Sequence, residues 1–304
     1  MKIIIPMTGT GQRFKDAGYQ DLKPLIEVNG KKIIEHVVAL FPGEKDFVFI
    51  CREDHLRGTN MREILMKTCP TARIMETIGH KFGPVYTVSK FFDFINDDES
   101  VVINYCDFFM DWDYDHFKKI VLENDCDACL PAYQGFHPHL LPEKNFYASM
   151  KANPDGYMEE IREKYSFTPN KMDSLQQPGT FYFKNGSLVK KYFEQMMKEK
   201  NELNGEYYIS LVYNLLVRDN LKVFIYDRVP YFCQWGTPED LEEYNAWSNF
   251  FGKYCDLKDV NALWKEAKMN KKLRGRDNYN DETLKRIFDY WKAFFTKVDF
   301  HPFN

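Results

Sequence analysis

The sequence contains no long apolar run. Although 44% of its 304 residues are hydrophobic, no segment approaches the roughly 18 consecutive apolar residues of a membrane-spanning helix. The N-terminus has one lysine and a short apolar stretch, and it lacks the small-residue cleavage site of a signal peptide. These absences favour a cytoplasmic protein without a membrane partner.

An excess of positive charge is also missing. Lysine and arginine total 41 against 45 aspartates and glutamates, which gives a net charge of −4 and a pI near 6.0. A general nucleic-acid binder normally carries a basic face. We therefore expect no nucleic-acid partner, even for the basic run at 268–276.

Paired cysteines of the zinc-finger type are absent. The seven cysteines are scattered and odd in number, as expected for reduced thiols. Cys126 and Cys129 form a CxxC, but no second pair stands nearby and no histidine follows at zinc-finger spacing. His137 and His139 likewise have no third ligand at a suitable spacing, so neither pair predicts a metal site.

Strand-like apolar runs alternate with amphipathic segments from residue 1 to about 130, which predicts a mostly parallel α/β sheet with helices on both faces. Turn signals between 130 and 187 indicate an antiparallel, hairpin-rich insertion. The predicted strands are Ile3–Ile5, Phe47–Ile50, Ala72–Glu76, Val101–Asn104, Ala128–Ala132, Thr180–Phe183 and Val223–Tyr226. The predicted helices are Ile33–Leu40, Met61–Lys67, Val85–Phe94, Tyr114–Leu122, Leu188–Lys200, Tyr207–Asp219 and Pro238–Phe251.

A glycine-rich turn, MTGTGQRF, follows the first predicted strand. Loops at the carboxyl edge of such a sheet bind ligands, and glycines there let the backbone approach a phosphate. Arg13 and Lys23 flank the turn, and two cations suit a triphosphate under attack. Phe14 stands where a dinucleotide-binding turn needs its third glycine, and the P-loop spacing is also absent. Taken alone, the turn fits a charged surface loop almost as well.

The stretch MTGTGQRF…GYQDLKPLIEVNGKKIIEHVV resembles the signature of the nucleotidyltransferases that activate phosphorylated sugars and related phosphates. Further segments resemble the family in the same order, over about residues 1–247. They are FGPVYTV (82–88), VVINYCDFFMDWD (101–113), EEIREKYSFTP (159–169), QPGTFYFKNGSLV (177–189), NGEYYISLVYNLLVRDN (204–220) and WGTPEDLEEY (235–244).

This resemblance implies a Rossmann-like, mostly parallel mixed sheet of the GT-A-like type. Residues 1–247 would form the catalytic domain, with the insertion at about 130–187 lining the acceptor site, and 252–304 would form a small helical appendage. The implied reaction transfers a nucleoside monophosphate from an NTP to a phosphorylated acceptor and releases pyrophosphate. The implied family members, of cytidylyl or uridylyl type, make precursors of capsule and other surface glycans, which favours a pyrimidine NTP.

The resemblance also implies roles for individual residues. Arg13 and Lys23 would be the catalytic cations, and Asp107 would hold Mg²⁺. Nucleotide contacts would come from Gly9, Thr10, Gly11, Gln12, Gly83 and Pro84. Acceptor contacts would come from Lys164, Gly179, Glu206 and Tyr207. A second metal ligand, common in the family before the Gly-Thr-Pro segment, has no carboxylate here, because the sequence at 232–236 is FCQWG.

Simpler interpretations remain open for several of these residues. Lys164 also fits a solvated surface lysine, Asp107 a turn or cap residue, and Glu206 a carboxylate at a helix N-terminus. Two rival functions are a GT-A-like glycosyltransferase, which would use Asp111-Trp-Asp113 as its Asp-x-Asp motif, and a nucleotide sensor without activity. A sensor would have lost Arg13, Lys23 or Asp107. The acceptor itself stays open between a sugar 1-phosphate, an alditol phosphate and a non-sugar phosphate.

The last part of the chain lies beyond the resemblance. Phe288, Trp291 and Phe295 recur at three- and four-residue spacing and would form one apolar stripe on a helix. A stripe of this size is too apolar to be left in water. We expect the segment 252–304 to dock on the α/β domain and to help form a homodimer.

Overall fold

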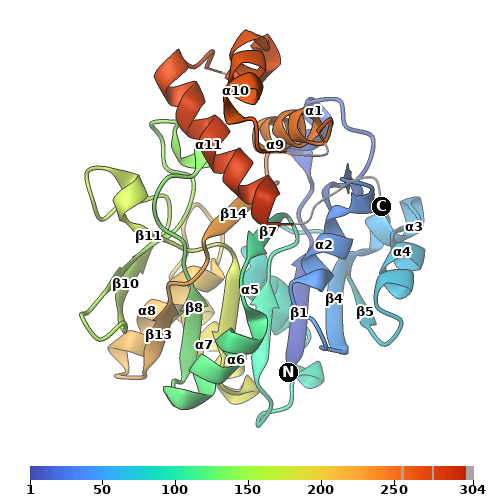
Figure 1. Ribbon diagram of the computed structural model, residues 1–304. Helices are drawn as coiled ribbons and strands as arrows, with labels where there is room; N and C mark the ends of the chain where they lie inside the picture. The colour runs from blue at the N-terminus through green and yellow to red at the C-terminus, as the bar shows by residue number, and fades with distance from the viewer. Residues whose placement is uncertain (255–256, 276, 299–304) are drawn as a thin grey trace.

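The computed structural model describes residues 1–254, 257–275 and 277–298. Its centre is a seven-stranded sheet in the order β13-β8-β12-β6-β1-β4-β5 (Figure 1). β12 runs antiparallel to both of its neighbours, and the other pairings are parallel, which confirms the predicted mixed sheet. The strands are β1 (Lys2–Met7), β4 (Asp46–Arg52), β5 (Arg73–Thr77), β6 (Val101–Asn104), β8 (Ala128–Pro131), β12 (Thr180–Phe183) and β13 (Val223–Tyr226).

Different helices cover the two faces of the sheet. Successive side chains of a strand point to opposite faces, so Ile3 and Ile5 of β1 enter one core while Ile4 enters the other. The first core includes residues of α2 (Ile33–Ala39), α3 (Glu53–Gly58), α4 (Met61–Thr68) and α6 (Tyr114–Glu123). The second includes residues of α5 (Gly83–Ser89), α7 (Gly186–Lys198) and α8 (Ile209–Arg218).

Short antiparallel pairings lie outside the main sheet. β9 (Ser149–Ala152), β10 (Met158–Arg162) and β11 (Leu175–Gln176) form the three-stranded sheet that the turn signals between 130 and 187 predict. β7 (Phe108–Asp111) pairs with β14 (Tyr231–Gln234), and β2 (Glu27–Val28) with β3 (Lys31–Lys32). Neither β7 nor β14 was predicted from the sequence, because the two strands pair with each other and lie more than a hundred residues apart along the chain.

Several short helical turns complete the chain. α1 (Gln12–Asp16) follows the glycine-rich turn directly. The 3-10 turns are η1 (Lys23–Leu25), η2 (Phe92–Phe94), η3 (Pro138–Leu140), η4 (Lys171–Asp173) and η5 (Lys271–Arg274). His137 and His139 at η3 are both buried, and among the described residues no group of three His, Cys, Asp or Glu is arranged to hold a metal.

The C-terminal helices are α9 (Pro238–Phe251), α10 (Val260–Met269) and α11 (Asp281–Lys297). Figure 1 shows them gathered at the end of the molecule toward which β1 points. The Tyr290 hydroxyl of α11 donates to the Phe232 carbonyl at 3.1 Å, and Phe288 and Trp291 are buried in the first core. The tail therefore packs on the α/β part of its own chain.

Parts of the expected appendage, residues 255–256, 276 and 299–304, lie outside the described residues. The division at residue 247 and the homodimer stay predictions. None of the helices in the described ranges combines the length and the apolar character that crossing a membrane requires.

Candidate active site

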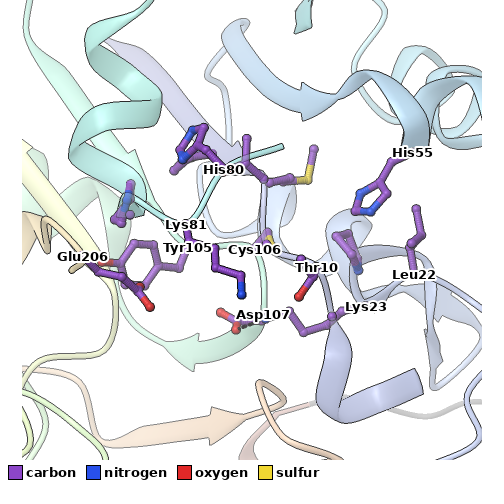
Figure 2. A pocket seen from close by; sticks show the side chains of 18 of the residues that line it. Thr10, Leu22, Lys23, His55, His80, Lys81, Tyr105, Cys106, Asp107 and Glu206 are labelled. Carbon is purple, nitrogen blue, oxygen red and sulfur yellow. Dashed lines mark hydrogen bonds and ion pairs between the residues drawn. The ribbon is translucent and has the colours of Figure 1, made fainter. Parts of the chain in front are cut away.

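A pocket of about 450 Å³ opens at the carboxyl ends of β1 and β6, which are neighbours in the sheet. Its wall is built from the turn after β1, the segment after β6, the start of η1, the start of α5 and the segment before α8. Figure 2 shows Lys23 and Asp107 near its centre, with Tyr105 and Glu206 to one side and His55 and Leu22 to the other. The lining residues are Pro6, Met7, Thr8, Gly9, Thr10, Gly11, Leu22, Lys23, Pro24, His55, His80, Lys81, Gly83, Pro84, Tyr105, Cys106, Asp107, Glu206 and Tyr208.

The glycine-rich turn presents backbone to this pocket. Gly11 has φ of +65°, a conformation that glycine adopts at little cost. The backbone N–H groups of Gly9–Gln12 donate no hydrogen bond to any other described residue. Donors held in this way at the wall of a pocket are available to the oxygens of an anion.

Lys23 and Asp107 form an ion pair at the centre of the pocket. Lys23 Nζ lies 2.6 Å from Asp107 Oδ2, and both side chains are about one-fifth exposed. Burial disfavours the ammonium, but the Asp107 carboxylate outweighs this effect and raises the pKa of Lys23. Lys23 therefore carries a full positive charge at neutral pH.

The segment between β14 and α9 fixes Asp107 from behind. The Trp235 N–H donates to the Asp107 carbonyl at 3.0 Å. Gly236 packs so closely that a Cβ there would lie 2.8 Å from Asp107 Oδ2. The carboxylate is thus held between a backbone wall and the Lys23 ammonium.

One wall of the pocket is held by backbone contacts to Tyr207. The Tyr207 N–H donates to the Phe82 carbonyl at 2.9 Å, and its carbonyl accepts from the Val85 N–H at 3.2 Å. Gly83 has φ of +84°, and a Cβ there would lie 2.8 Å from both the N and the O of Tyr207. Only glycine fits where the chain at residue 83 approaches the Tyr207 backbone this closely. Gly83 and Pro84 both line the pocket.

Acidic and aromatic groups flank Tyr207 in the same wall. Glu206 and Tyr208 line the pocket. Glu163 lies behind them, where the Ser210 hydroxyl donates to its Oε1 and burial raises its pKa. Burial, with Glu163 nearby, also raises the pKa of Tyr105 well above its ordinary value, so its hydroxyl stays protonated. Lys164 Nζ lies 5.7 Å from the centre of the Tyr208 ring.

The structure brings many of the predicted site residues into one pocket. Its wall includes Gly9, Thr10, Gly11, Lys23, Gly83, Pro84, Asp107 and Glu206. The others lie outside the wall, although the positive charge of Arg13 reaches Lys23. Arg13, Gln12 and Lys164 are exposed, and the Gln12 amide donates to Asp16 at 2.7 Å. Their roles stay predictions.

Two predicted acceptor contacts take a structural position. Tyr207 contributes the backbone contacts described above. Gly179 is buried, and its carbonyl accepts from the Tyr105 N–H at 2.9 Å. A Cβ at Gly179 would lie 2.9 Å from Phe108 and 3.0 Å from Tyr105. Gly179 therefore sets the position of Tyr105, and its direct contact with an acceptor stays a prediction.

Sequence reasoning missed other residues of the wall. Among them are Thr8, His55, His80, Lys81, Tyr105 and Tyr208. His80 and Lys81 stand immediately before the FGPVYTV segment, and Tyr105 stands two residues before Asp107, so proximity to a motif was an available signal. His55 follows β4, where only the sheet order reveals that it faces the pocket.

The Asp-x-Asp motif of the rival glycosyltransferase has other contacts. Asp111 Oδ2 lies 2.6 Å from Lys297 Nζ of α11. Asp113 is the N-cap of α6 and accepts from the His116 N–H at 2.8 Å. Neither carboxylate lines the pocket. The arrangement fits two structural carboxylates better than a metal motif.

Comparison with solved structures identifies the same fold in known proteins. A nucleoside-diphosphate-sugar pyrophosphorylase from Vibrio cholerae RC9 superposes with a TM-score of 0.65 at 20% identity, over 80% of this chain and 99% of its own. A candidate glucose-1-phosphate thymidylyltransferase from Bacillus anthracis gives 0.65 at 18%, over 81% and 94%. The inositol-1-phosphate CTP transferase of T. maritima gives 0.61 at 15%, over 79% and 90%. This chain is therefore similar in fold to nucleotidyltransferases.

Searches by sequence find nothing comparable: no protein-family model and no curated protein matches the chain.

Proposed function

We propose that the protein transfers a nucleoside monophosphate from an NTP to a phosphorylated acceptor and releases pyrophosphate. The observation that carries this proposal is the Lys23–Asp107 ion pair, which lies in one pocket with the glycine-rich turn and with Glu206 and Tyr208. A cation beside free backbone donors suits a triphosphate, and a nearby carboxylate suits its metal. The shared fold supports the same reaction class.

The triphosphate would bind along the glycine-rich turn. The N–H groups of Gly9–Gln12 would donate to its oxygens, because they have no partner among the described residues. Arg13 would hold the β- and γ-phosphates, and its charge is already felt at Lys23. Lys23 would stabilise the negative charge that grows at the α-phosphate.

Mg²⁺ fits the donor chemistry at Asp107. Magnesium in such sites is usually held by one or two carboxylates together with phosphate oxygens and waters, and Asp107 is the carboxylate of the pocket centre. Gly236 packs closely against Oδ2, and Asp107 lines the pocket, so Asp107 would hold the ion there. When bound, the ion would neutralise phosphate charge and orient the α-phosphate and the acceptor.

The acceptor phosphate needs no general base, because it is already an anion. One of its oxygens would attack the α-phosphorus in line, and the bond to the oxygen that bridges the α- and β-phosphates would break. Pyrophosphate would leave with that oxygen. Lys164 would bind the acceptor phosphate, and Glu206 would accept hydrogen bonds from the acceptor's hydroxyl groups.

A pyrimidine NTP is the proposed nucleotide. Two of the similar structures are named for CTP and for thymidylyl transfer, which supports this choice. Gly83 and Pro84 would present backbone to the base. We further propose the cytoplasm as the location, where NTPs are made, and a product that serves as a precursor of capsule or another surface glycan.

The decisive test is pyrophosphate release. The purified protein is incubated with Mg²⁺, one NTP and one phosphorylated acceptor at a time, drawn from sugar 1-phosphates, alditol phosphates and non-sugar phosphates. We expect release that needs both substrates and is fastest with CTP or UTP. Hydrolysis of a nucleoside-diphosphate sugar, with no pyrophosphate from any NTP pair, would instead support a glycosyltransferase.

A further inference from the structure

His80 hydrogen bonds through both ring nitrogens at the edge of the pocket. Its Nδ1 lies 3.2 Å from the backbone N of Phe82, and its Nε2 lies 3.2 Å from Thr87 Oγ1. The Phe82 N–H is able only to donate, so Nδ1 must be the acceptor and carry no proton. Neutral His80 therefore holds its proton on Nε2 and donates it to Thr87.

Thr87 extends this contact toward the glycine-rich turn. Its hydroxyl is fully buried and lies 2.9 Å from Thr8 Oγ1 and 3.2 Å from the Gly83 carbonyl. Thr8 directly precedes Gly9, and Gly83 belongs to the opposite wall. Hydrogen bonds from His80 through Thr87 thus join two walls of the pocket. In the proposed function, the Gly83 wall binds the nucleobase and the glycine-rich turn binds the phosphates.

The surroundings of His80 oppose its protonation. Burial lowers its pKa below 6.5, and the positive charges of Lys90 and Arg52 lower it further. The rings of Phe82 and Tyr86 pack against the imidazole, with centroids 6.0 and 4.8 Å away. A second proton would place an N–H on Nδ1, directly facing the Phe82 N–H, so the contact to Phe82 would be lost.

We propose that His80 is a positioning residue, which in its neutral form locks the Phe82–Pro84 wall to the glycine-rich turn in the geometry that binds a nucleotide. This inference rests on the proposed function for the identity of the ligand. Its structural part, the lock itself, is a property of the free protein. Protonation of His80 at acid pH opens the lock and weakens nucleotide binding.

The lock is tested first without any ligand. Nitrogen-15 NMR of the imidazole identifies the tautomer, and amide exchange measures protection of the Phe82 N–H. We expect the Nε2–H tautomer at neutral pH, and we expect protection at Phe82 to fall as His80 titrates. The Nδ1–H tautomer, or protection that does not follow the His80 titration, would overturn the proposal.

Two matched pairs of variants then distinguish a positioning role of His80 and Thr87 from a general effect on folding. Thr87→Val keeps the shape but removes the hydroxyl, and Thr87→Ser restores it. His80→Asn places an acceptor near Nδ1 but does not reach Thr87, and His116→Asn alters a half-buried histidine that hydrogen bonds Tyr226 outside the pocket. All are compared with wild type by isothermal titration with CTP and with UTP, each with Mg²⁺, at about pH 7.5 and about pH 5.5.

We expect Thr87→Val and His80→Asn each to weaken nucleotide binding by about tenfold at pH 7.5, as the loss of one buried hydrogen bond does. Thr87→Ser and His116→Asn should bind like wild type. The double variant should be no weaker than either single one, because both break the same chain. Additive losses, or an equal loss in Thr87→Ser, would overturn the proposal.

Comparing the affinities at the two pH values tests the effect of His80 protonation on nucleotide binding. The nucleotide's own ionisation affects every variant equally, so only the difference from wild type matters. We expect wild type to lose more affinity than His80→Asn between the two pH values. An equal loss would assign the pH effect to another group, such as His55. If no NTP binds to any variant at either pH, the proposed function fails while the tautomer and exchange data still decide the lock.

Discussion

Lys23 and Asp107 lie 84 residues apart in the sequence, yet Lys23 Nζ contacts Asp107 Oδ2 at 2.6 Å. The pair forms because η1 and the end of β6 meet at the same edge of the sheet. In the proposed reaction the two groups have different partners, the α-phosphate for the ammonium and the metal for the carboxylate. In that proposed reaction, substrate binding would weaken this contact, and the ion pair stabilises each charged group in the free protein.

Loss of the Lys23 ammonium should slow turnover with little effect on the fold. Lys23→Ala is expected to lower kcat by about 10²–10³, the usual effect of removing one preorganised charge at a reacting centre. Steady-state pyrophosphate release measures this effect, with Lys67→Ala on the exposed face of α4 as the control. Turnover within about threefold of wild type would contradict the catalytic role.

Asp107 should control the metal requirement. Asp107→Asn keeps the shape of the side chain and removes its charge, so the Mg²⁺ concentration for half-maximal rate should rise about tenfold or more. A magnesium titration at saturating NTP gives this value. If the Mg²⁺ dependence stays unchanged while the thermal midpoint falls, the Lys23 ion pair is structural and the metal binds elsewhere.

The sequence was sufficient to predict the seven strands of the main sheet, because each is a short apolar run bounded by turns. It did not predict their order. The pairing of β12 between β6 and β8 is set by contacts between distant segments, which local periodicity does not report. β7 was missed for the same reason, since Phe108–Asp111 becomes a strand only when Tyr231–Gln234 lies beside it.

The lining of the pocket was predictable where a residue stands in a motif and reaches the pocket through its own position in a loop. Lys23, Asp107 and Gly83 are of this kind. Gly179 and Tyr207 belong to motifs too, but the structure uses their backbones to position Tyr105 and Phe82. His80 stands next to a motif, which indicates a place near the pocket, but its hydrogen bonds to Phe82 and Thr87 depend on the local turn, so the spacing does not predict them.

Gly83 should tolerate no side chain. In Gly83→Ala the new Cβ would lie 2.8 Å from the Tyr207 backbone, at a φ of +84° that alanine rarely adopts. We expect CTP and UTP affinity to fall about tenfold or more, with a smaller effect on the acceptor, as the wall shifts. Isothermal titration measures both, and Gly58→Ala, where a Cβ meets nothing within 4 Å, is the control. Wild-type affinity in Gly83→Ala would show that this wall does not contact the nucleotide.

Stability should fall in mildly acidic solution because of His137. Burial lowers the pKa of His137 from 6.5 to about 4. Above pH 6.5 the ring is neutral in both folded and unfolded chains. As the pH falls from 6.5 to about 4, His137 binds a proton in the unfolded chain but stays neutral in the folded chain. The free energy of unfolding therefore falls by up to about 3 kcal/mol.

Thermal or urea unfolding over this pH range measures the loss, and His137→Phe should flatten the curve. The ring contacts of His137 with Tyr133 and Tyr290 suit an aromatic replacement. Equal slopes for variant and wild type would mean that other buried histidines, His36 and His55 among them, whose pKa values are also lowered by burial, dominate the acid response.

Phe288 should matter for stability, because the apolar stripe of α11 is buried within the chain. Its ring packs against Trp264, Phe251 and Trp247, with centroids 5.5, 5.6 and 6.3 Å away. Phe288→Ala leaves a cavity there and should lower the free energy of unfolding by about 3–5 kcal/mol. Urea unfolding measures this loss, and Met269→Ala on exposed α10 is the control, since Met269 is 78% exposed.

Phe288→Ala also distinguishes packing of the tail on its own chain from formation of a dimer. Phe288 and Trp291 are covered by their own chain, which leaves little of the stripe for a partner, so a homodimer needs another surface. Analytical ultracentrifugation below the unfolding transition should therefore give Phe288→Ala the same mass as wild type, whatever that mass is. A dimeric wild type with a monomeric, still folded Phe288→Ala would show that α11 lies at the subunit interface. Wild-type stability in Phe288→Ala would show that the tail does not depend on this packing at all.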